Sequence, residues 1–216
     1  MLFIICGHGN GDTGAVGNGY KEYERVRKLA EQIKKFGGKN VTIGDTSKNW
    51  YKSKLVNNTN IPKGALVLEL HMDSSSIKTK RGAHVIIDKD LKADKYDEAL
   101  AEYLSSVLIG RSEKIVKRDD LANLNRAQKY GINYRIVECG FISNADDVKI
   151  FNTRMDEIAK GILKCFDIPV VSQPSESNSN PSEMYRVQVG AFKSKANAEK
   201  LINALKSKGF DAYIVS

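Results

Sequence analysis

Cysteine is scarce in this sequence. The 216 residues include only Cys6, Cys139 and Cys165, and no two of them are closely spaced. Their odd number and wide spacing argue against a disulfide framework and against a structural zinc knuckle. Cys6 and Cys139 stand in strand-like contexts, so we expect both to be small core residues.

The sequence also has no long apolar run. No stretch is long enough to span a bilayer. The segment Met1–Cys6 is too short for the core of a signal peptide and carries no basic leader. We therefore expect a protein that has no membrane partner, is made in the cytoplasm without a signal peptide, and reaches any target outside the cell only after release.

Acidic residues are fewer than basic ones, which gives a formal net charge of +8. This charge favours an anionic partner such as a nucleic acid, a membrane surface or an anionic polymer, although solubility alone also explains it. No RNA- or DNA-binding motif accompanies the charge, so we expect no nucleic-acid partner. The glycine-rich loop Gly7–Gly19 has neither the Gly-Lys-Ser/Thr ending of a phosphate-binding loop nor dinucleotide spacing, which argues against nucleotide binding.

Three apolar segments lead into His8, His71 and Glu138. The segments are Leu2–Cys6, Leu66–Leu70 and Tyr134–Val137. Short apolar runs of this kind predict buried strands. Because α/β sheets place their ligands at the carboxyl ends of parallel strands, we expect these three side chains to meet at one edge of one sheet.

A helix is predicted over Tyr20–Phe36, and a carboxylate falls on its apolar side. Glu22 lies four residues before Val26 of the apolar stripe, whereas Glu24 falls on the polar side with Arg27. An unpaired buried charge is costly, so Glu22 needs a partner, and a metal would be one. The helix alone favours a plainer interpretation, in which Glu22 is a residue of the first helical turn that only complements the helix dipole.

His8, Glu22 and His71 together form a donor set for a metal. Catalytic zinc takes three protein ligands and leaves one position for a water, whose pKa it lowers to about 7. Glu138 would take the proton from this water and later protonate the leaving amine, which predicts a metal-dependent hydrolase.

Each of these residues also has a plainer interpretation. His8 could cap a turn, and His71 could be a hydrogen-bonded residue at a strand end. Glu138 could pair with a basic residue such as Arg126. Two histidines and one carboxylate can also hold iron, so the donor set alone does not fix the metal.

Strands and helices alternate over the first 170 residues, which predicts an α/β fold with a mostly parallel twisted sheet and helices on both faces. Further strands are predicted at Asn40–Ile43 and His84–Ile87, and further helices at Tyr96–Ile109 and from Asn144 to about Phe166. His84 itself is interpreted as structural. The segment Asp45–Lys63 is interpreted as a loop with a short helix, and Arg111–Tyr130 as basic and irregular.

Composition changes sharply after residue 170. Residues 171–183 are rich in Ser, Asn and Pro, which predicts a flexible linker between a catalytic domain, 1–170, and a small module, 184–216. The module is predicted as a β-α-β unit with the elements Tyr185–Val189, Ser194–Lys208 and Ala212–Val215. A unit of this size is too small to bury a good core alone.

Three motifs stand in a recognisable order. They are Gly7-His8-Gly9 with Asp12-x-Gly14-Ala15 and Asn18–Glu22, then Leu70-His71, then Val137–Asn144. Together they resemble the motifs of zinc-dependent N-acetylmuramoyl-L-alanine amidases of the amidase-3 type, over roughly Leu2 to Ile168. The resemblance implies zinc on His8, Glu22 and His71, a catalytic role for Glu138, and hydrolysis of the amide between N-acetylmuramic acid and L-alanine in peptidoglycan.

The segment from Tyr185 to Phe192 resembles the start of a SPOR-type peptidoglycan-binding module. Such modules have two β-α-β halves, and only one is present here, which predicts a homodimer that completes one sheet from two tails. The resemblance implies a wall-lytic enzyme, either a phage endolysin or a sporulation hydrolase, that acts on the bacterial cell wall after release. The alternative is a non-catalytic wall-binding protein on an amidase fold.

Overall fold

The computed structural model describes residues 1–171, 189–210 and 212–214. By its internal contacts the chain divides into two compact units, Met1–Gln173 and Pro174–Ser216, and each is described by itself. No helix within the described ranges is long and apolar enough to cross a membrane.

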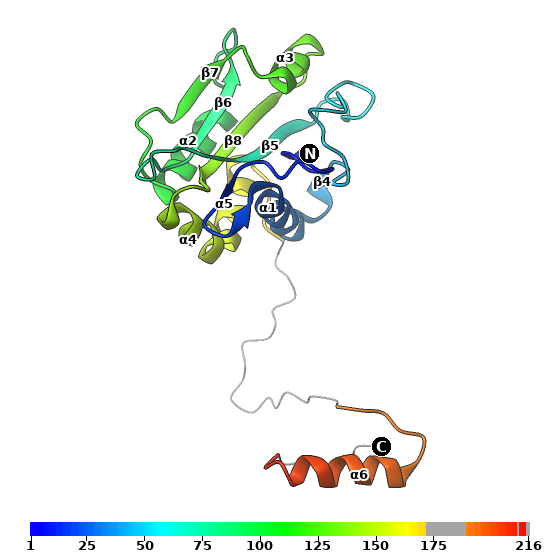
Figure 1. Ribbon diagram of the computed structural model, residues 1–216. Coiled ribbons are helices and arrows are strands. Elements are labelled where there is room, and N and C mark those ends of the chain that lie inside the picture. The colour runs from blue at the N-terminus through cyan, green and yellow to red at the C-terminus, as the bar shows by residue number, and fades with distance from the viewer. Residues whose placement is uncertain (172–188, 211, 215–216) are drawn as a thin grey trace. The chain divides into compact units, whose positions relative to one another are not determined.

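A six-stranded sheet forms the centre of the first unit (Figure 1). In sheet order its strands are β4 (Val41–Ile43), β1 (Leu2–Cys6), β5 (Leu66–Asp73), β8 (Tyr134–Phe141), β6 (His84–Asp88) and β7 (Ile115–Arg118). All neighbouring pairs are parallel except β6 and β8, which are antiparallel. Both faces of this sheet are covered, which explains why β1 and β6 are apolar throughout most of their length. The predicted α/β fold with a mostly parallel sheet is confirmed.

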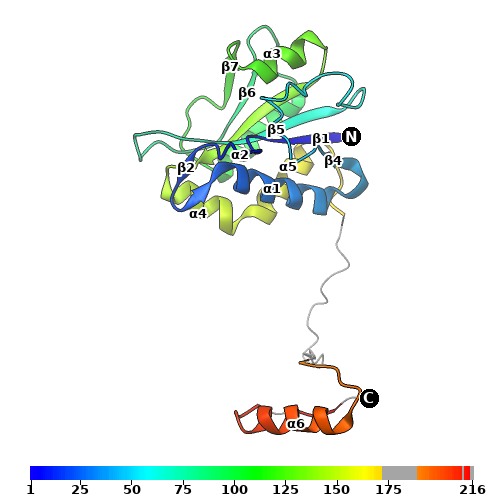
Figure 2. The same cartoon turned by 45° about the vertical axis from the view of Figure 1, so that its right-hand side comes forward.

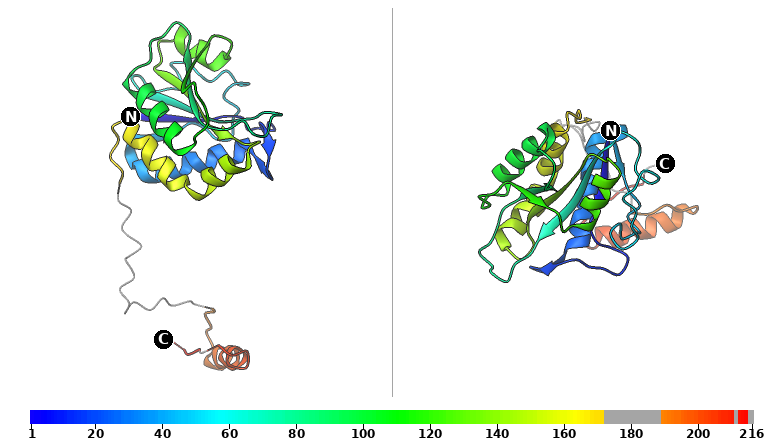
Figure 3. Two further views of the ribbon diagram at one scale, coloured as in Figure 1. Left: turned by 90° about the vertical axis from the view of Figure 1, so that its left-hand side faces the viewer. Right: turned by 90° about the horizontal axis from the view of Figure 1, so that it is seen from above.

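Helices cover both faces of the sheet (Figure 2), four of them packing into the core of one face and a fifth into that of the other. The four are α1 (Glu22–Gly37), α2 (Lys95–Val107), α4 (Ala145–Thr153) and α5 (Met155–Cys165), and the fifth is α3 (Ala122–Lys129). Helices α1 and α5 run side by side (Figure 3). The apolar stripe of α1, which includes Val26, Leu29 and Ile33, is completely buried in the core of this face. On the other face, the loop that contains Trp50 packs with Leu124 of α3.

Three local predictions are wrong. The segment Arg111–Tyr130 is not irregular, because it contains β7 and α3. Residues 45–63, all of them described, form turns but no helix. The last helix of the first unit is interrupted at Arg154, so α4 and α5 are separate helices. Asn144 does cap α4 as predicted, because its side chain accepts hydrogen bonds from two backbone N–H groups of the first turn.

The second unit contains the predicted helix, α6 (Lys195–Lys206), with Ser194 at its N-cap position. The strand predicted over Tyr185–Val189 lies outside the described residues except for Val189. The described part of the predicted strand Ala212–Val215, residues 212–214, is not a strand. A strand needs a hydrogen-bonded partner, and Tyr213 and Ile214 are exposed.

Candidate metal centre

His71 and Glu138 lie next to each other on the two central strands. Strands β5 and β8 are parallel neighbours, and in their register His71 pairs with Glu138. Paired residues on adjacent strands point to the same face of a sheet, so both side chains project from the same side. The two strands therefore place an imidazole and a carboxyl group at one sheet edge, as the sequence predicts.

Glu22 begins α1 and points into the protein rather than into solvent, with 3% of its surface exposed. Its Oε1 lies 2.9 Å from His71 Nδ1 and accepts a hydrogen bond of 3.1 Å from the backbone N–H of Met72. Its Oε2 lies 3.2 Å from His8 Nε2 and accepts from the backbone N–H of Ala15 at 2.9 Å. Burial alone would raise the pKa of Glu22, but the contacts with both histidines outweigh it and lower the pKa far below its usual range. Glu22 does stand in the first turn of α1, but it does more than complement the helix dipole, because its carboxylate contacts both histidines.

His8 follows β1 in a left-handed backbone conformation, with φ of 60°. Few residues other than glycine adopt this conformation, and such strain concentrates at functional sites. His8 Nδ1 lies 3.3 Å from Asp12 Oδ2, while its Nε2 faces Glu22. Burial would lower the pKa of His8, but Glu22 and Asp12 raise it above the usual value.

Arg27 holds the loop that carries His8. Its guanidinium donates to the carbonyl oxygens of Gly7 and His8, both at 3.1 Å, and also to that of Thr46. Arg27 is half-buried, and its side chain turns back along α1 towards the loop, where it also donates to the Tyr23 carbonyl oxygen. Glycine is required at position 14, where φ is 62° and a Cβ would come within 2.6 Å of both Glu22 and the His8 ring.

The ligand atoms of His8, Glu22 and His71 all lie within 4.8 Å of one another. The two imidazole rings are edge to face, with their centroids 5.0 Å apart. Two imidazole nitrogens and a carboxylate are a donor set that catalytic zinc accepts. Gly14, which has no side chain, lies directly against Glu22 and the His8 ring. The residues present therefore fit a divalent metal.

Glu138 stands beside this cluster without joining it. Its Oε2 is buried and finds no hydrogen-bond partner among the described residues. Burial raises the pKa of Glu138 to about 7, and the positive charge of His71 only partly offsets this effect. The alternative pairing with Arg126 is wrong, because Arg126 donates to Asn123 and to the Tyr51 carbonyl oxygen instead. A carboxyl group that is half protonated at neutral pH can both take up and release a proton.

A cavity of about 330 Å³ opens beside the cluster. Its wall includes His8 and His71 together with Asn49, Glu69 and Asn123. The sequence interpretation assigned no role to the last three. The period of two along β5 could have identified Glu69, which must share a face with His71. Asn123 lies on α3, in the segment predicted to be irregular, and Asn49 lies in a loop.

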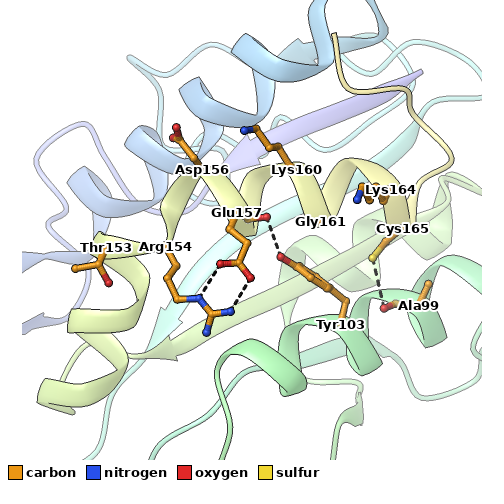
Figure 4. A pocket seen from close by; sticks show the side chains of 10 residues that line it. All are labelled: Ala99, Tyr103, Thr153, Arg154, Asp156, Glu157, Lys160, Gly161, Lys164 and Cys165. Atoms are coloured by element: carbon orange, nitrogen blue, oxygen red, sulfur yellow. Dashed lines mark hydrogen bonds and ion pairs between the residues drawn. The ribbon is translucent and has the colours of Figure 1, made fainter. Parts of the chain in front are cut away.

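A larger hollow, of about 840 Å³, lies on a different part of the first unit, between α2 and α5 (Figure 4). Three of its polar residues pair with one another: Tyr103 donates to the Glu157 carbonyl oxygen, and Arg154 pairs with the Glu157 carboxylate through two nitrogens. It includes none of the four predicted site residues. Size alone therefore does not make it the functional site.

Two sequence families match the chain. A family described as N-acetylmuramoyl-L-alanine amidase matches residues 2–166. This chain belongs to that amidase family. Residues 167–216 of this chain match the SPOR domain. Both predicted resemblances are therefore confirmed.

Curated bacterial proteins are similar to this chain. The "Probable autolysin PH" of Staphylococcus aureus is 30% identical over 178 residues, which cover 74% of this chain but only 36% of the autolysin. The "Sporulation-specific N-acetylmuramoyl-L-alanine amidase" of Bacillus subtilis is 25% identical over 228 aligned positions, covering 99% of this chain and 84% of that protein. The chain thus spans about a third of the first relative and most of the second.

Solved amidase structures share the fold of the first unit. The CwlD amidase of Clostridioides difficile, solved in complex with the GerS lipoprotein, has a TM-score of 0.62 and 18% identity over 77% of this chain and 96% of that chain. The catalytic domain of the CD27L endolysin has a TM-score of 0.59 and 22% identity over 79% of this chain and 98% of that chain. At these identities the likeness concerns the fold alone.

Proposed function

We propose that this chain hydrolyses the amide between N-acetylmuramic acid and L-alanine in peptidoglycan, with zinc held by His8, Glu22 and His71. The observation that carries the proposal is the convergence of these three ligand atoms within 4.8 Å beside a carboxyl group with a pKa of about 7. Membership of the amidase family supports the choice of bond.

The residues of the site have different roles in the proposed reaction. Glu22 faces both imidazoles and holds His8 and His71 around one point. When bound there, zinc supplies an activated water and a Lewis acid for the scissile carbonyl. Glu138 then has two tasks, because its carboxylate form takes a proton from the attacking water and its protonated form gives a proton to the leaving amine of L-alanine. We assign these transfers to its buried Oε2, which has no hydrogen-bond partner among the described residues.

The C-terminal unit supports a peptidoglycan partner, because residues 167–216 match the SPOR domain. We infer that this unit attaches the enzyme to the wall, and the +8 net charge suits an anionic wall polymer. A role in wall lysis, as an endolysin or a sporulation hydrolase, is part of this proposal, as is action on the wall after release from the cytoplasm. The homodimer predicted from the half module gains no support from the comparisons and stays a prediction.

Digestion of purified bacterial walls tests the proposal. The full chain should release new free amino termini of L-alanine, and a chelator should stop this release. Glu138→Gln should lower the rate by about 10²- to 10⁴-fold, the usual contribution of a general acid–base residue. Glu24→Gln is the matched control, since Glu24 is a half-exposed carboxylate on the same helix and should leave the rate unchanged.

Different products would contradict the proposal in different ways. New reducing sugar ends without L-alanine termini would indicate cleavage of the glycan instead. Binding to walls without any cleavage would support the non-catalytic alternative. A Glu138→Gln variant that digests walls at the full rate would remove Glu138 from the mechanism.

A further inference from the structure

Glu69 is a buried carboxylate that the proposed reaction does not use. It lies two residues before His71 on β5, so both side chains project from the same face of the sheet. Its exposed fraction is 3%, and its Oε1 lies 3.3 Å from His71 Nε2. The other ring nitrogen, Nδ1, lies 2.9 Å from Glu22. The two nitrogens of His71 therefore face two different carboxylates.

Other side chains hold Glu69 in place. The buried Tyr134 hydroxyl donates to its Oε2, and the buried Asn123 amide donates to both carboxylate oxygens at 3.1 and 3.3 Å. These donors come from β8 and α3. A buried carboxylate is costly unless it is hydrogen-bonded, so this arrangement is a built site rather than a chance contact.

The His71 ring is also confined by the backbone. A Cβ at Gly7 would lie 2.4 to 2.7 Å from three atoms of the ring, so the ring packs directly against a residue that has no side chain. The backbone at Gly7 and the Glu69 carboxylate thus define one orientation of the His71 imidazole. In a metal site, the hydrogen bond at one ring nitrogen decides which nitrogen is left to bind the metal.

We propose that Glu69 is a positioning residue that keeps the proton of His71 on Nε2 and so leaves Nδ1 to bind the metal. The inference rests on the proposed zinc site. A similar contact, more exposed, occurs at His8, where Asp12 faces Nδ1 and Glu22 faces Nε2. Each histidine then presents one nitrogen to the shared centre and the other to an outer carboxylate.

Nitrogen NMR of the zinc-loaded full chain tests this assignment directly. The chain has three histidines, so ¹⁵N-histidine labelling gives a simple spectrum in which the two ring nitrogens can be told apart. The expected result is a proton on Nε2 of His71 and zinc on Nδ1. Zinc on Nε2 of His71 would overturn the inference, and this measurement needs no variant that must fold.

Zinc affinity supplies a second test. In competition with a chromogenic chelator, Glu69→Gln should bind zinc about 10- to 100-fold more weakly, the usual loss for an outer-shell partner. The control is Asp97→Asn, which alters another buried carboxylate, one that pairs with Arg135. It should leave zinc affinity unchanged even if it lowers stability.

The outcomes separate this inference from the proposed function. The positioning role is overturned, while the zinc site stands, if Glu69→Gln keeps the zinc affinity of the unaltered chain. The same holds if Asp97→Asn loses as much zinc affinity as Glu69→Gln. If the unaltered chain binds no zinc, the proposed function fails and the inference fails with it.

Discussion

His84 is the histidine that stays outside the metal cluster. It begins β6 opposite Glu138, is 4% exposed, and its Nδ1 has no hydrogen-bond partner among the described residues. Burial, together with the nearby charges of Arg111 and Arg118, lowers its pKa from 6.5 to about 4. The structural role of His84 stays a prediction, and the lowered pKa implies that the stability of the protein depends on pH.

We expect His84 to destabilise the protein in acid. The unfolded chain takes up a proton on this residue near pH 6.5, whereas the folded chain resists it until about pH 4. The contribution of His84 to the free energy of unfolding is therefore complete above pH 6.5. It is lost as the pH falls towards 4, which lowers the free energy of unfolding by about 3 kcal/mol. Urea unfolding of the metal-free chain at pH 7 and pH 4.5 measures it. His84→Phe should lose less stability than the unaltered chain over this interval, and equal losses would contradict the pKa assignment.

The sequence alone indicated His8, Glu22, His71 and Glu138, because each has a local signal at a strand end or on a helix face. The structure brings the first three together and places Glu138 beside them. Their roles stay predictions. The contacts made by Arg27 and Asn123 could not be predicted in the same way. Arg27 turns back to carbonyl groups of a distant loop, and no periodic pattern encodes such a contact.

The glycine-rich loop is the element that shapes the metal centre. Gly14 and Gly19 both adopt positive φ, but their surroundings differ. A Cβ at Gly14 would press on Glu22 and His8, whereas a Cβ at Gly19 would have no described atom within 4 Å. The two positions therefore form a matched pair.

We expect Gly14→Ala to disable the site and Gly19→Ala to spare it. Both variants should lose about 1 to 2 kcal/mol of stability, because alanine is strained at positive φ. Only Gly14→Ala should displace the metal ligands Glu22 and His8. We expect this displacement to lower the rate of L-alanine release by about 10²-fold. Equal rates for the two variants would argue that the loop does not shape the centre.

A second element-scale feature joins β8 to α2. Arg135 is 1% exposed, donates to Asp97 at 2.7 Å and to Asp94 at 2.9 Å, and lies over the ring of Phe166. Removal of one partner of a buried ion pair leaves the other charge uncompensated.

We expect Arg135→Ala to lower the free energy of unfolding by about 3 to 5 kcal/mol. Urea unfolding measures this loss. The double variant Arg135→Met with Asp97→Asn should recover much of it, because no buried charge would then lack its partner at this position. A double variant less stable than Arg135→Ala would contradict this explanation.

Element boundaries were predicted well where apolar periodicity was uninterrupted, as in β1 and α1. The boundaries were wrong where the apolar periodicity of the sequence was weak. The basic residues of β7 and α3 mask short apolar patterns, so the segment looked irregular. The break between α4 and α5 falls at Arg154, where no Gly or Pro marks it, and the apolar spacing continues across the break.

At the scale of the whole molecule, the chain consists of a large unit and a small one. The helix of the small unit buries none of its residues, and large apolar side chains such as Phe192, Phe210 and Tyr213 are exposed there. Exposed apolar groups of this kind mark interaction surfaces. The predicted domain boundaries at 170 and 184 stay predictions, because residues 172–188 are not described.

We expect a chain that ends at Val171 to separate cleavage from wall attachment. It should hydrolyse soluble muropeptides at the rate of the full chain, because the centre lies entirely within the first unit. It should bind insoluble walls more weakly in a sedimentation assay. Light scattering of both forms tests the homodimer, and a monomeric full chain would refute it. Equal wall binding by the two forms would contradict the attachment role of the second unit.

The most direct measurement is an anomalous diffraction map of crystals of the zinc-loaded full chain, collected on both sides of the zinc absorption edge. We expect one strong peak in contact with His8, Glu22 and His71, at about 2.0 to 2.2 Å from each ligand atom. The peak should vanish in crystals of Glu22→Gln and persist in those of Glu24→Gln. A zinc peak that touches none of the three residues, or no peak at all, would contradict the metal centre on which the proposed function depends.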